Sequence, residues 1–296
     1  MIEHTLASLA RIASGRLVGA DLPFAAISTD SRNLPAGALF VALKGPNFDG
    51  HEFVATALAR GASGALVERE LPLALPQIVV PDTLAALTTF ARVWRESFAI
   101  PVIAVTGSNG KTTTKEMLGA IMARGGACLV TQGNLNNHIG VPLTLLRLAA
   151  THRSAVIEMG ANHQGEIAAL AAIARPTVGI ITNAGAAHLE GFGGLDGVAR
   201  GKGELLRALS ANGVAVVNAD DTYATFWRES SNTHVMTFGL QKAADFSARN
   251  VRGRAATSGF NFEFDLVTPL GTRATTLALA GEHNLRNALG AAAAAY

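Results

Sequence analysis

The stretch VIAVTGSNGKTTTKEM, residues 102–117, decides the fold class of this chain. An apolar run leads into a loop with two glycines, which is followed by a lysine and three threonines. Glycines let backbone N–H groups approach phosphate oxygens, and a helix that begins there presents its positive end to them. The usual G-x-x-x-x-G-K-[ST] pattern requires a glycine five residues before Gly110, where this chain has Val105. The stretch predicts a phosphate-binding loop that differs from motor and GTPase loops; the alternative is a strand-to-helix turn with a chance Gly-Lys-Thr.

Apolar, β-branched runs recur after this loop, separated by helical segments. They are ACLVTQ, SAVIEMG, TVGIITNAG and GVAVVNAD. Such continuous apolar strands are typical of a parallel sheet covered by helices on both faces. Beyond residue 233, ADFSARNVRG, SGFNFEFDLVTP and TRATTLALAG alternate apolar and polar residues, which indicates a small antiparallel section before a last helix in GEHNLRNALGAAAAAY. We therefore expect an α/β central domain of P-loop type over residues 83–296.

Residues 1–82 alternate short helices and strands, which predicts a small α/β N-terminal domain. Helical spacing is found in TLASLARIAS and in HEFVATALARG, and strands are expected at Ala38–Leu43, GALVE and QIVV. Prolines at positions 72, 76 and 81 end this region. We place the domain boundary near Asp82, a good N-cap for a helix over Thr83–Ser97.

The composition excludes several classes of protein. Of the 296 residues, 49% are apolar, and the net charge of +2 comes from scattered residues, so we expect no nucleic-acid partner. No run reaches the roughly 18 apolar residues of a membrane span, and the N-terminus lacks the features of a signal peptide. The single Cys128 cannot form an intrachain disulfide, which fits a reducing compartment. We expect a cytoplasmic protein without membrane insertion.

Polar residues follow four of the predicted strands. Because ligands bind beyond the carboxyl ends of parallel strands, these side chains should meet at one edge of the sheet. They are Thr106–Thr112 after the first strand, Asn134, Asn136, Asn137 and His138 after the second, Glu158 at the end of the third, and His188 and Glu190 after the fourth.

The chemistry of these residues suits phosphate transfer. Lys111 would neutralise β/γ-phosphate charge, and the Thr112 hydroxyl could bind Mg²⁺. Glu158 ends a buried strand, where a carboxylate is costly unless it is paired or metal-bound. For Glu158 the alternative is a helix-capping or salt-bridged carboxylate; for His188 it is an ordinary loop histidine, and for the asparagines it is a turn.

These residues together resemble the Mur ligases, the ATP-dependent amide-forming enzymes of peptidoglycan synthesis. The loop TGSNGKTTT has the family's departure from the early glycine. The segments that resemble later family motifs, in the same order, are GNLNNHIGVP, IEMGANHQGEI, TNAGAAHLEGFG, ARGKGEL and GEHNLRNALGAAAA. Two of them most resemble the member that adds D-alanyl-D-alanine to UDP-N-acetylmuramoyl-tripeptide, whereas the ligase that adds the third residue typically has an aspartate-rich segment at residues 187–190.

The resemblance implies roles for particular residues. ATP would be bound by Thr106, Gly107, Ser108, Asn109, Gly110, Lys111, Thr112 and Thr113, with Asn284 and Asn287 near the adenine. Mg²⁺ would be held by Thr112, Glu158 and His188. Lys111, Lys202 and His188 would be catalytic, and Lys202 matches a lysine that many members carry as a carbamate. The substrate would be bound by Ser31, Arg32, Asn47, Asp49, Gly50, Asn134 and Asn137.

The implied reaction uses ATP and Mg²⁺ to join D-alanyl-D-alanine to UDP-N-acetylmuramoyl-tripeptide through an acyl phosphate, with the protein acting as a monomer. The N-terminal domain would bind the UDP-substrate and the central domain ATP. Family members carry a further C-terminal domain, which we expect to be absent from this chain. The alternatives are a Mur-type ligase that adds a single amino acid, the more distant folylpolyglutamate synthase, and a nucleotide-binding fragment without ligase activity.

Overall fold

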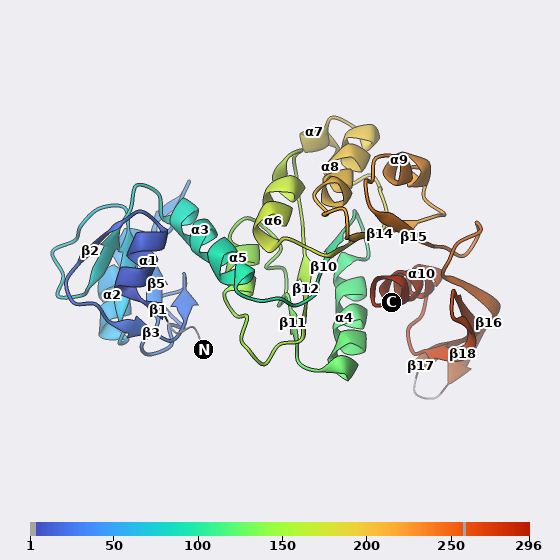
Figure 1. Cartoon of the computed structure of the whole chain (residues 1–296), viewed down its shortest axis with the longest axis horizontal. Helices are drawn as coiled ribbons and strands as arrows, with labels where there is room; N and C mark the ends of the chain where they lie inside the picture. Colours follow the sequence, from blue (N-terminus) through green and yellow to red (C-terminus); the bar gives the residue numbers. More distant parts are fainter. Residues whose placement is uncertain (1–3, 257–258) are drawn as a thin grey trace. The chain divides into compact units, whose positions relative to one another are not determined.

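The structure is a computed structural model that describes residues 4–256 and 259–296. The chain forms two compact units (Figure 1). The first comprises Met1–Ala99 with Pro142–Ala150, and the second comprises Ile100–Val141 with Thr151–Tyr296.

The first unit is built on a five-stranded sheet. In sheet order its strands are β2 (Arg16–Val18), β9 (Gln77–Val79), β8 (Gly64–Val67), β5 (Leu39–Val41) and β4 (Ile27–Ser28). All neighbours are parallel except β2 and β9. β5 and β8 are buried along their whole length, as expected for central strands of apolar sequence.

Two small antiparallel pairs and several helices complete the first unit. The pairs are β1 (His4–Thr5) with β3 (Pro23–Phe24) and β6 (Lys44–Gly45) with β7 (Phe48–Asp49). The helices are α1 (Leu6–Ile12), the 3₁₀ helix η1 (Gly50–Phe53), α2 (Val54–Ala59) and α3 (Thr83–Glu96). Asp82 is the N-cap of α3, as predicted, and its carboxylate accepts the Ala85 N–H at 2.9 Å.

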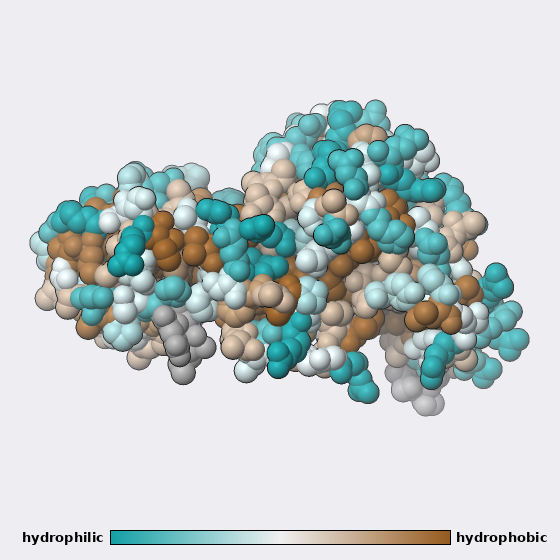
Figure 2. All heavy atoms as spheres, in the orientation of Figure 1, coloured by the Kyte–Doolittle hydropathy of each residue, from teal (hydrophilic) through white to brown (hydrophobic). Residues whose placement is uncertain are grey.

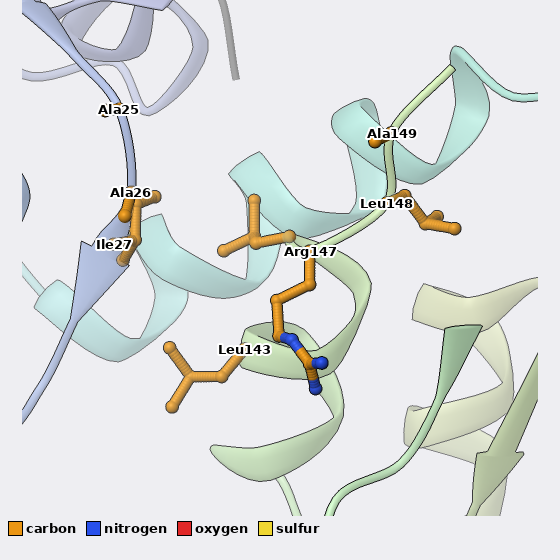
Figure 3. Close-up of a pocket in the computed structure, with 8 residues that line it drawn as sticks. Ala25, Ala26, Ile27, Leu143, Arg147, Leu148 and Ala149 are labelled. Atoms are coloured by element: carbon orange, nitrogen blue, oxygen red, sulfur yellow. The ribbon is translucent and has the colours of Figure 1, made fainter. Parts of the chain in front are cut away.

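Residues 142–150, which include most of α5 (Gly140–Leu145), group with the first unit although they lie far from its other residues in the sequence. Trp94 of α3 donates its indole N–H to the Leu148 carbonyl at 3.2 Å. A shallow, mainly aliphatic pocket lies between Ala25–Ile27 and the segment 143–149 (Figure 3). The segment therefore packs against both α3 and the start of β4.

The second unit is built on a six-stranded sheet that is parallel throughout. In sheet order its strands are β11 (Cys128–Val130), β12 (Ser154–Glu158), β10 (Val102–Thr106), β13 (Val178–Ile181), β14 (Val214–Asn218) and β15 (His234–Phe238). From β10 the chain crosses to β11 on one side, returns through β12, and then continues to β13 on the other side of β10. The carboxyl end of β10 is therefore the switch point at which such sheets bind ligands.

Helices cover both faces of this sheet. They are α4 (Lys111–Met122) with the 3₁₀ turn η2 (Ala123–Gly125), α6 (Glu166–Ala174), α7 (Leu189–Phe192), α8 (Leu195–Arg207), α9 (Ala224–Glu229) and α10 (Glu282–Ala294). Ile180 packs in a core cluster with residues of α4 and α10, whereas its neighbour Ile181 packs with residues of α8 and α9. Successive strand residues thus enter opposite cores, which explains why the strands read as continuous apolar runs.

A three-stranded antiparallel sheet precedes α10. Its strands are β16 (Ser247–Ala256), β17 (Gly259–Thr268) and β18 (Gly271–Leu277). Phe264 of β17 joins the same core cluster as Leu285 and Leu289 of α10. Figure 1 shows β16–β18 beside α10, which in turn lies against α4. The predicted fold class is confirmed: an α/β chain with a helix-covered parallel sheet and a small antiparallel section.

The division between the units falls after Ala99, whereas the sequence suggested a boundary near Asp82. Helix α3 groups with the first unit because it packs against α1 there, where Phe90 and Leu87 are fully buried. The Phe90 ring also meets the His4 and Phe24 rings edge-on. The helix that was expected to open the central domain thus belongs to the N-terminal unit.

Among residues 4–256 and 259–296, no helix combines the length and apolar character that a membrane crossing requires. Hydrophilic residues gather over α7, α8 and α9 in the view of Figure 2. Asp196, Arg200 and Arg207 form the exposed face of α8, while its opposite face is buried against the sheet. The amphipathic sequence of this helix accounts for both faces.

Candidate active site

The loop between β10 and α4 depends on two glycines. Gly110 is the N-cap of α4 with φ +79°, and Gly107 has φ +148°, both in the region that favours glycine. A Cβ on Gly107 would lie 1.9 Å from Thr182 Oγ1, and one on Gly110 would lie 2.5 Å from Asn287 Oδ1. The loop therefore fits closely between β13 and α10, and its backbone can take this path because both positions lack a side chain.

The residues that follow β13 hold the loop in place. The Thr182 hydroxyl donates to the Asn109 carbonyl at 2.6 Å, and the Asn183 side chain exchanges two 3.0 Å hydrogen bonds with the Asn109 backbone. The Ser108 N–H donates to the Asn183 carbonyl at 3.0 Å. Asn183 was not among our predicted site residues, although its position directly after a buried strand could have indicated it.

Lys111 begins α4, and its ammonium group turns back onto the loop. Its Nζ lies 2.7 Å from the Gly107 carbonyl and 3.2 Å from the Ser108 carbonyl. Burial lowers the pKa of Lys111, and the nearby Glu158 carboxylate partly opposes this effect. A cation held against the loop that begins a helix is well placed to meet an anion there.

Glu158 is the centre of a hydrogen-bonded cluster at the carboxyl ends of neighbouring strands. Its side chain is 2% exposed. The Thr112 hydroxyl donates to its Oε2 at 3.1 Å, and the Asn136 amide donates to its Oε1 at 2.7 Å. The structure thus brings together the predicted Thr112 and Glu158. Asn136, which the sequence placed at this edge together with Asn134 and Asn137, is the asparagine that contacts the carboxylate.

A second lysine, Lys115, also reaches this cluster. Its side chain is fully buried, and Nζ lies 3.8 Å from Glu158 Oε2 and 3.3 Å from the Gly133 carbonyl. We did not select Lys115 from the sequence. Its spacing of four residues from Lys111, which places both on one face of α4, was the available signal.

Lys202 lies on the buried face of α8, with 2% of its surface exposed. Burial and the charge of Lys111 lower its pKa to about 8, while Glu166 and Glu204 act in the opposite direction. Its ammonium lies 5.1 Å from the centre of the Phe192 ring, a cation–π distance. The lysine assigned only by resemblance is therefore buried and within electrostatic range of the loop lysine.

The lowered pKa of Lys202 makes stability depend on pH. Below pH 8 both the folded and the unfolded chain carry the proton on Lys202, so the full cost of burying its charge is present. Between pH 8 and 10.5 the unfolded chain binds more protons than the folded chain, so the free energy of unfolding rises with pH. We expect the free energy of unfolding of the wild type to gain about 2–3 kcal/mol relative to Lys202→Met over this window. Urea unfolding at pH 7.5 and pH 10.5, in buffer free of CO₂, measures this difference. Parallel pH profiles for the two proteins would contradict it.

The other residues predicted at this edge are less closely connected. His188 is exposed at the start of α7 with φ +54°, and no hydrogen bond or ion pair joins its side chain to Glu158 within the described part of the chain. Asn134 is exposed, and Asn137 Oδ1 accepts the Ile139 and Gly140 N–H groups at the start of α5. The side-chain oxygen of Asn137 thus makes the local contacts of a turn residue, which is the alternative that the sequence left open for this asparagine.

The two asparagines of α10 lie together at its first turns. Asn287 is 8% exposed and lies against Gly110 of the loop. Asn284 donates to the Ala280 carbonyl at 2.8 Å and accepts a 3.5 Å contact from the Asn287 amide. Asn287 of α10 thus lies against the loop, although the two are far apart in the sequence.

In the first unit, the predicted Ser31 is buried, while the Arg32 side chain is 84% exposed. The guanidinium forms two hydrogen bonds with the Asp30 carboxylate, at 2.9 and 3.1 Å, which lower the pKa of Asp30 to about 2. The fork of Arg32 is therefore held in place at the surface.

Asp49 ends β7 and Gly50 begins η1, whereas Asn47 is exposed in the turn before β7. Asp49 accepts the His51 backbone N–H at 2.9 Å, also contacts the buried His51 ring, and pairs with Arg69 at 3.1 Å; these contacts lower the pKa of Asp49. The His51 Nε2 accepts the Glu68 N–H at 2.8 Å. His51, which sequence reasoning missed, thus joins η1 to the residue that follows β8.

The same regions carry a family signature. Residues 105–295 match the Mur ligase middle domain, and residues 23–124 match the catalytic domain of the Mur ligase family. The chain belongs to the Mur ligase family. The match over 105–295 includes the loop lysine, Glu158, Lys202 and the asparagines of α10.

Individual Mur ligases cover almost the whole chain. It is 47% identical over 295 residues to the UDP-N-acetylmuramoyl-tripeptide--D-alanyl-D-alanine ligase of Escherichia coli, covering 99% of this chain and 64% of that protein. A crystal structure of MurF from Acinetobacter baumannii superposes with a TM-score of 0.91 at 41% identity, over 99% of this chain and 64% of that one. MurF from Thermotoga maritima in complex with ADP gives 0.77 at 28% identity, over 90% and 61%. The chain therefore spans just under two thirds of the length of these Mur ligases.

Proposed function

We propose that this chain is the substrate- and ATP-binding part of an ATP-dependent amide ligase that adds D-alanyl-D-alanine to UDP-N-acetylmuramoyl-tripeptide. The observation that carries the proposal is the cluster of Thr112, Asn136 and Glu158 beside Lys111, at the switch point of the parallel sheet. The names of the relatives, including the 47% identical E. coli ligase, support this substrate pair over others of the family.

ATP would lie on the loop 106–113 with its phosphates at Lys111 and its adenine near Asn284 and Asn287. The Thermotoga maritima relative in complex with ADP supports a nucleotide site in this fold. The closeness of Asn287 to Gly110 means that one nucleotide could contact both segments.

Mg²⁺ fits the residues that surround Glu158. A buried carboxylate and a hydroxyl are hard oxygen donors of the kind that Mg²⁺ prefers, and Glu158 and Thr112 already share a hydrogen bond. Within the described residues, no group of three His, Cys, Asp or Glu side chains forms a metal site, so phosphate oxygens and water would complete the coordination. Bound Mg²⁺ would offset charge on the phosphates. His188 remains a proposed ligand and catalytic residue.

The residues suit a reaction that activates a carboxylate. A carboxylate oxygen of the tripeptide attacks the γ-phosphorus of ATP, and ADP leaves. The amine of D-alanyl-D-alanine then attacks the acyl carbon of the acyl phosphate, loses a proton, and expels phosphate. Lys111 and Lys202 would stabilise the negative charge that moves in these steps, so the protein acts mainly by positioning and electrostatics.

We assign the UDP end of the substrate to the first unit, at Ser31, Arg32, Asn47, Asp49 and Gly50, and we propose Asn134 and Asn137 as further contacts. We further propose that the reaction takes place in the cytoplasm and that the protein acts as a monomer. A phosphate-release assay on the whole protein, offered D-alanyl-D-alanine or single amino acids, tests the assignment. Release that depends on a single amino acid would favour another Mur-type ligase.

The substrate site can be tested on this chain by titration with UDP-N-acetylmuramoyl-tripeptide. We expect calorimetry to detect binding, and Arg32→Ala to weaken it by about 10- to 100-fold, because a held guanidinium contributes charge-assisted bonds to a diphosphate. Arg16→Ala is the matched control, since Arg16 is also an exposed, ion-paired arginine of the first unit. Absence of binding by the wild type would overturn the substrate assignment, and equal affinities would remove Arg32 from the site.

A further inference from the structure

Lys115 is a buried cation for which the proposed reaction has no use. Its side chain is fully buried, and its ammonium contacts three oxygens, one of the neighbouring Glu116 and two from distant parts of the chain. These are Glu116 Oε1 at 3.0 Å, the Gly133 carbonyl at 3.3 Å and Glu158 Oε2 at 3.8 Å. Burial of an ammonium is costly unless such partners compensate it, so Lys115 requires an explanation.

The two lysines of α4 face Glu158 differently. Lys111 and Lys115 lie one helical turn apart, but the Lys111 ammonium is held by the Gly107 and Ser108 carbonyls within the phosphate loop. Lys115 instead pairs with the carboxylate itself. Of the two ammonium groups, that of Lys115 is the closer to the Glu158 carboxylate, and that of Lys111 is available to bind phosphate.

This pairing has two electrostatic consequences. A carboxylate that is 2% exposed would be strongly destabilising without nearby partners, so the Lys115 ammonium helps to compensate the burial of Glu158. The same positive charge repels any divalent cation that approaches Glu158. Glu158 should therefore be a weak metal ligand until negative phosphate groups arrive.

We propose that Lys115 is a positioning residue that acts as the standing counter-ion of Glu158 and so makes divalent-cation binding at this carboxylate depend on bound nucleotide. The inference rests on the proposed function, in which Glu158 binds Mg²⁺ beside ATP. It predicts that removal of the Lys115 charge strengthens metal binding in the absence of nucleotide. Loss of a residue that only supports the structure would weaken it instead.

The test compares the wild-type chain with Lys115→Met and Lys115→Arg, which remove and keep the charge at similar length. Mn²⁺, which replaces Mg²⁺ at oxygen sites and is counted by electron paramagnetic resonance, is titrated into each protein with and without ADP. Without ADP we expect Lys115→Met to bind Mn²⁺ at least about tenfold more tightly than the wild type. Lys115→Arg and the control Glu116→Gln, which alters only the exposed partner, should behave as the wild type does.

A stability cycle tests the counter-ion role without metal. In EDTA, Lys115→Met should lower the melting temperature by at least about 5 °C, because it leaves a buried carboxylate unpaired. Adding Glu158→Gln to Lys115→Met should restore part of that loss. If Lys115→Met does not fold, a double variant that does fold shows that the two charges depend on each other, and a double variant that also fails to fold while Glu158→Gln folds contradicts the counter-ion role.

The results separate the inference from the proposed function. If the wild type binds Mn²⁺ no better with ADP than without it, the proposed metal site at Glu158 fails. If ADP promotes Mn²⁺ binding to the wild type but Lys115→Met binds Mn²⁺ without ADP no more tightly than the wild type, the inference about Lys115 is overturned. Equal melting losses in the single and double Lys115 variants would overturn the counter-ion role as well.

Discussion

Replacing Lys111 with alanine is expected to weaken ATP binding to this chain by about 100-fold while changing its melting temperature by only a few degrees. The ammonium lies at the start of α4 against the Gly107 carbonyl, where it would form charge-assisted hydrogen bonds to phosphate. A pair of such bonds is worth on the order of 3 kcal/mol, which corresponds to this loss in affinity. The fold should survive because the Lys111 contacts are confined to the loop. Calorimetric titration of ATP with Mg²⁺, together with thermal melting, measures both quantities.

The matched control is Arg124→Ala, which removes an exposed cation just beyond the opposite end of the same helix. It should leave ATP affinity unchanged, since a distant exposed charge is screened by salt. In the whole protein, Lys111→Ala should also abolish ligase turnover. Near-normal affinity or turnover in this variant would remove the loop from the mechanism.

Most strands of the second unit could be predicted because burial on both faces leaves a strong apolar signal. The strand at Val102–Thr106 and the one at Val214–Asn218 are of this kind. We did not predict β15, His234–Phe238, since it lies at the sheet edge and only its alternate residues Met236 and Phe238 are buried. An edge strand needs less apolar sequence than a central one, and its signal is correspondingly weak.

The position of the domain boundary could not be predicted from the local sequence around Asp82. Asp82 was correctly predicted as an N-cap because capping involves only the next turn of the chain. Which unit α3 joins depends on packing against α1, some 80 residues earlier in the chain. The grouping of residues 142–150 with the first unit also depends on packing between distant residues, and no local sequence pattern predicts it.

The charged residues of the candidate site were more predictable than its amides: Asn136 was placed at the sheet edge without a role, and Asn183 was not selected. Lys111, Thr112 and Glu158 stood out because a lysine in a glycine loop and a carboxylate in a buried strand both require a chemical reason. Asn136 and Asn183 are common in turns, and their importance comes from contacts with residues 22 and 74 positions away in the chain. Such contacts follow from the pairing of β10 with β12 and β13. The sequence does not specify this pairing residue by residue.

The second large effect is expected for Gly107→Ala, which should lower the free energy of unfolding by about 2–6 kcal/mol. Gly107 has φ +148°, a conformation that side-chain-bearing residues rarely adopt, at a cost of about 1–3 kcal/mol. A Cβ there would also lie 1.9 Å from Thr182 Oγ1. Relieving such a contact costs about 1–3 kcal/mol more. Urea unfolding measures the loss. Gly125→Ala is the matched control, because nothing lies within 4 Å of a Cβ at that position, and it should be nearly neutral.

A double-mutant cycle with Thr182→Ala separates the two causes of the Gly107→Ala effect. Thr182→Ala alone should cost about 1 kcal/mol, because its hydroxyl donates to the Asn109 carbonyl at 2.6 Å. It also removes the atom that the new methyl group would strike, so the double variant should lose about 1–3 kcal/mol less than the sum of the single variants. The backbone strain at position 107 is unaffected by Thr182 and should remain in the double variant. Strict additivity would mean that the strained backbone, and not the contact with Thr182, is what makes glycine necessary at this position of the loop.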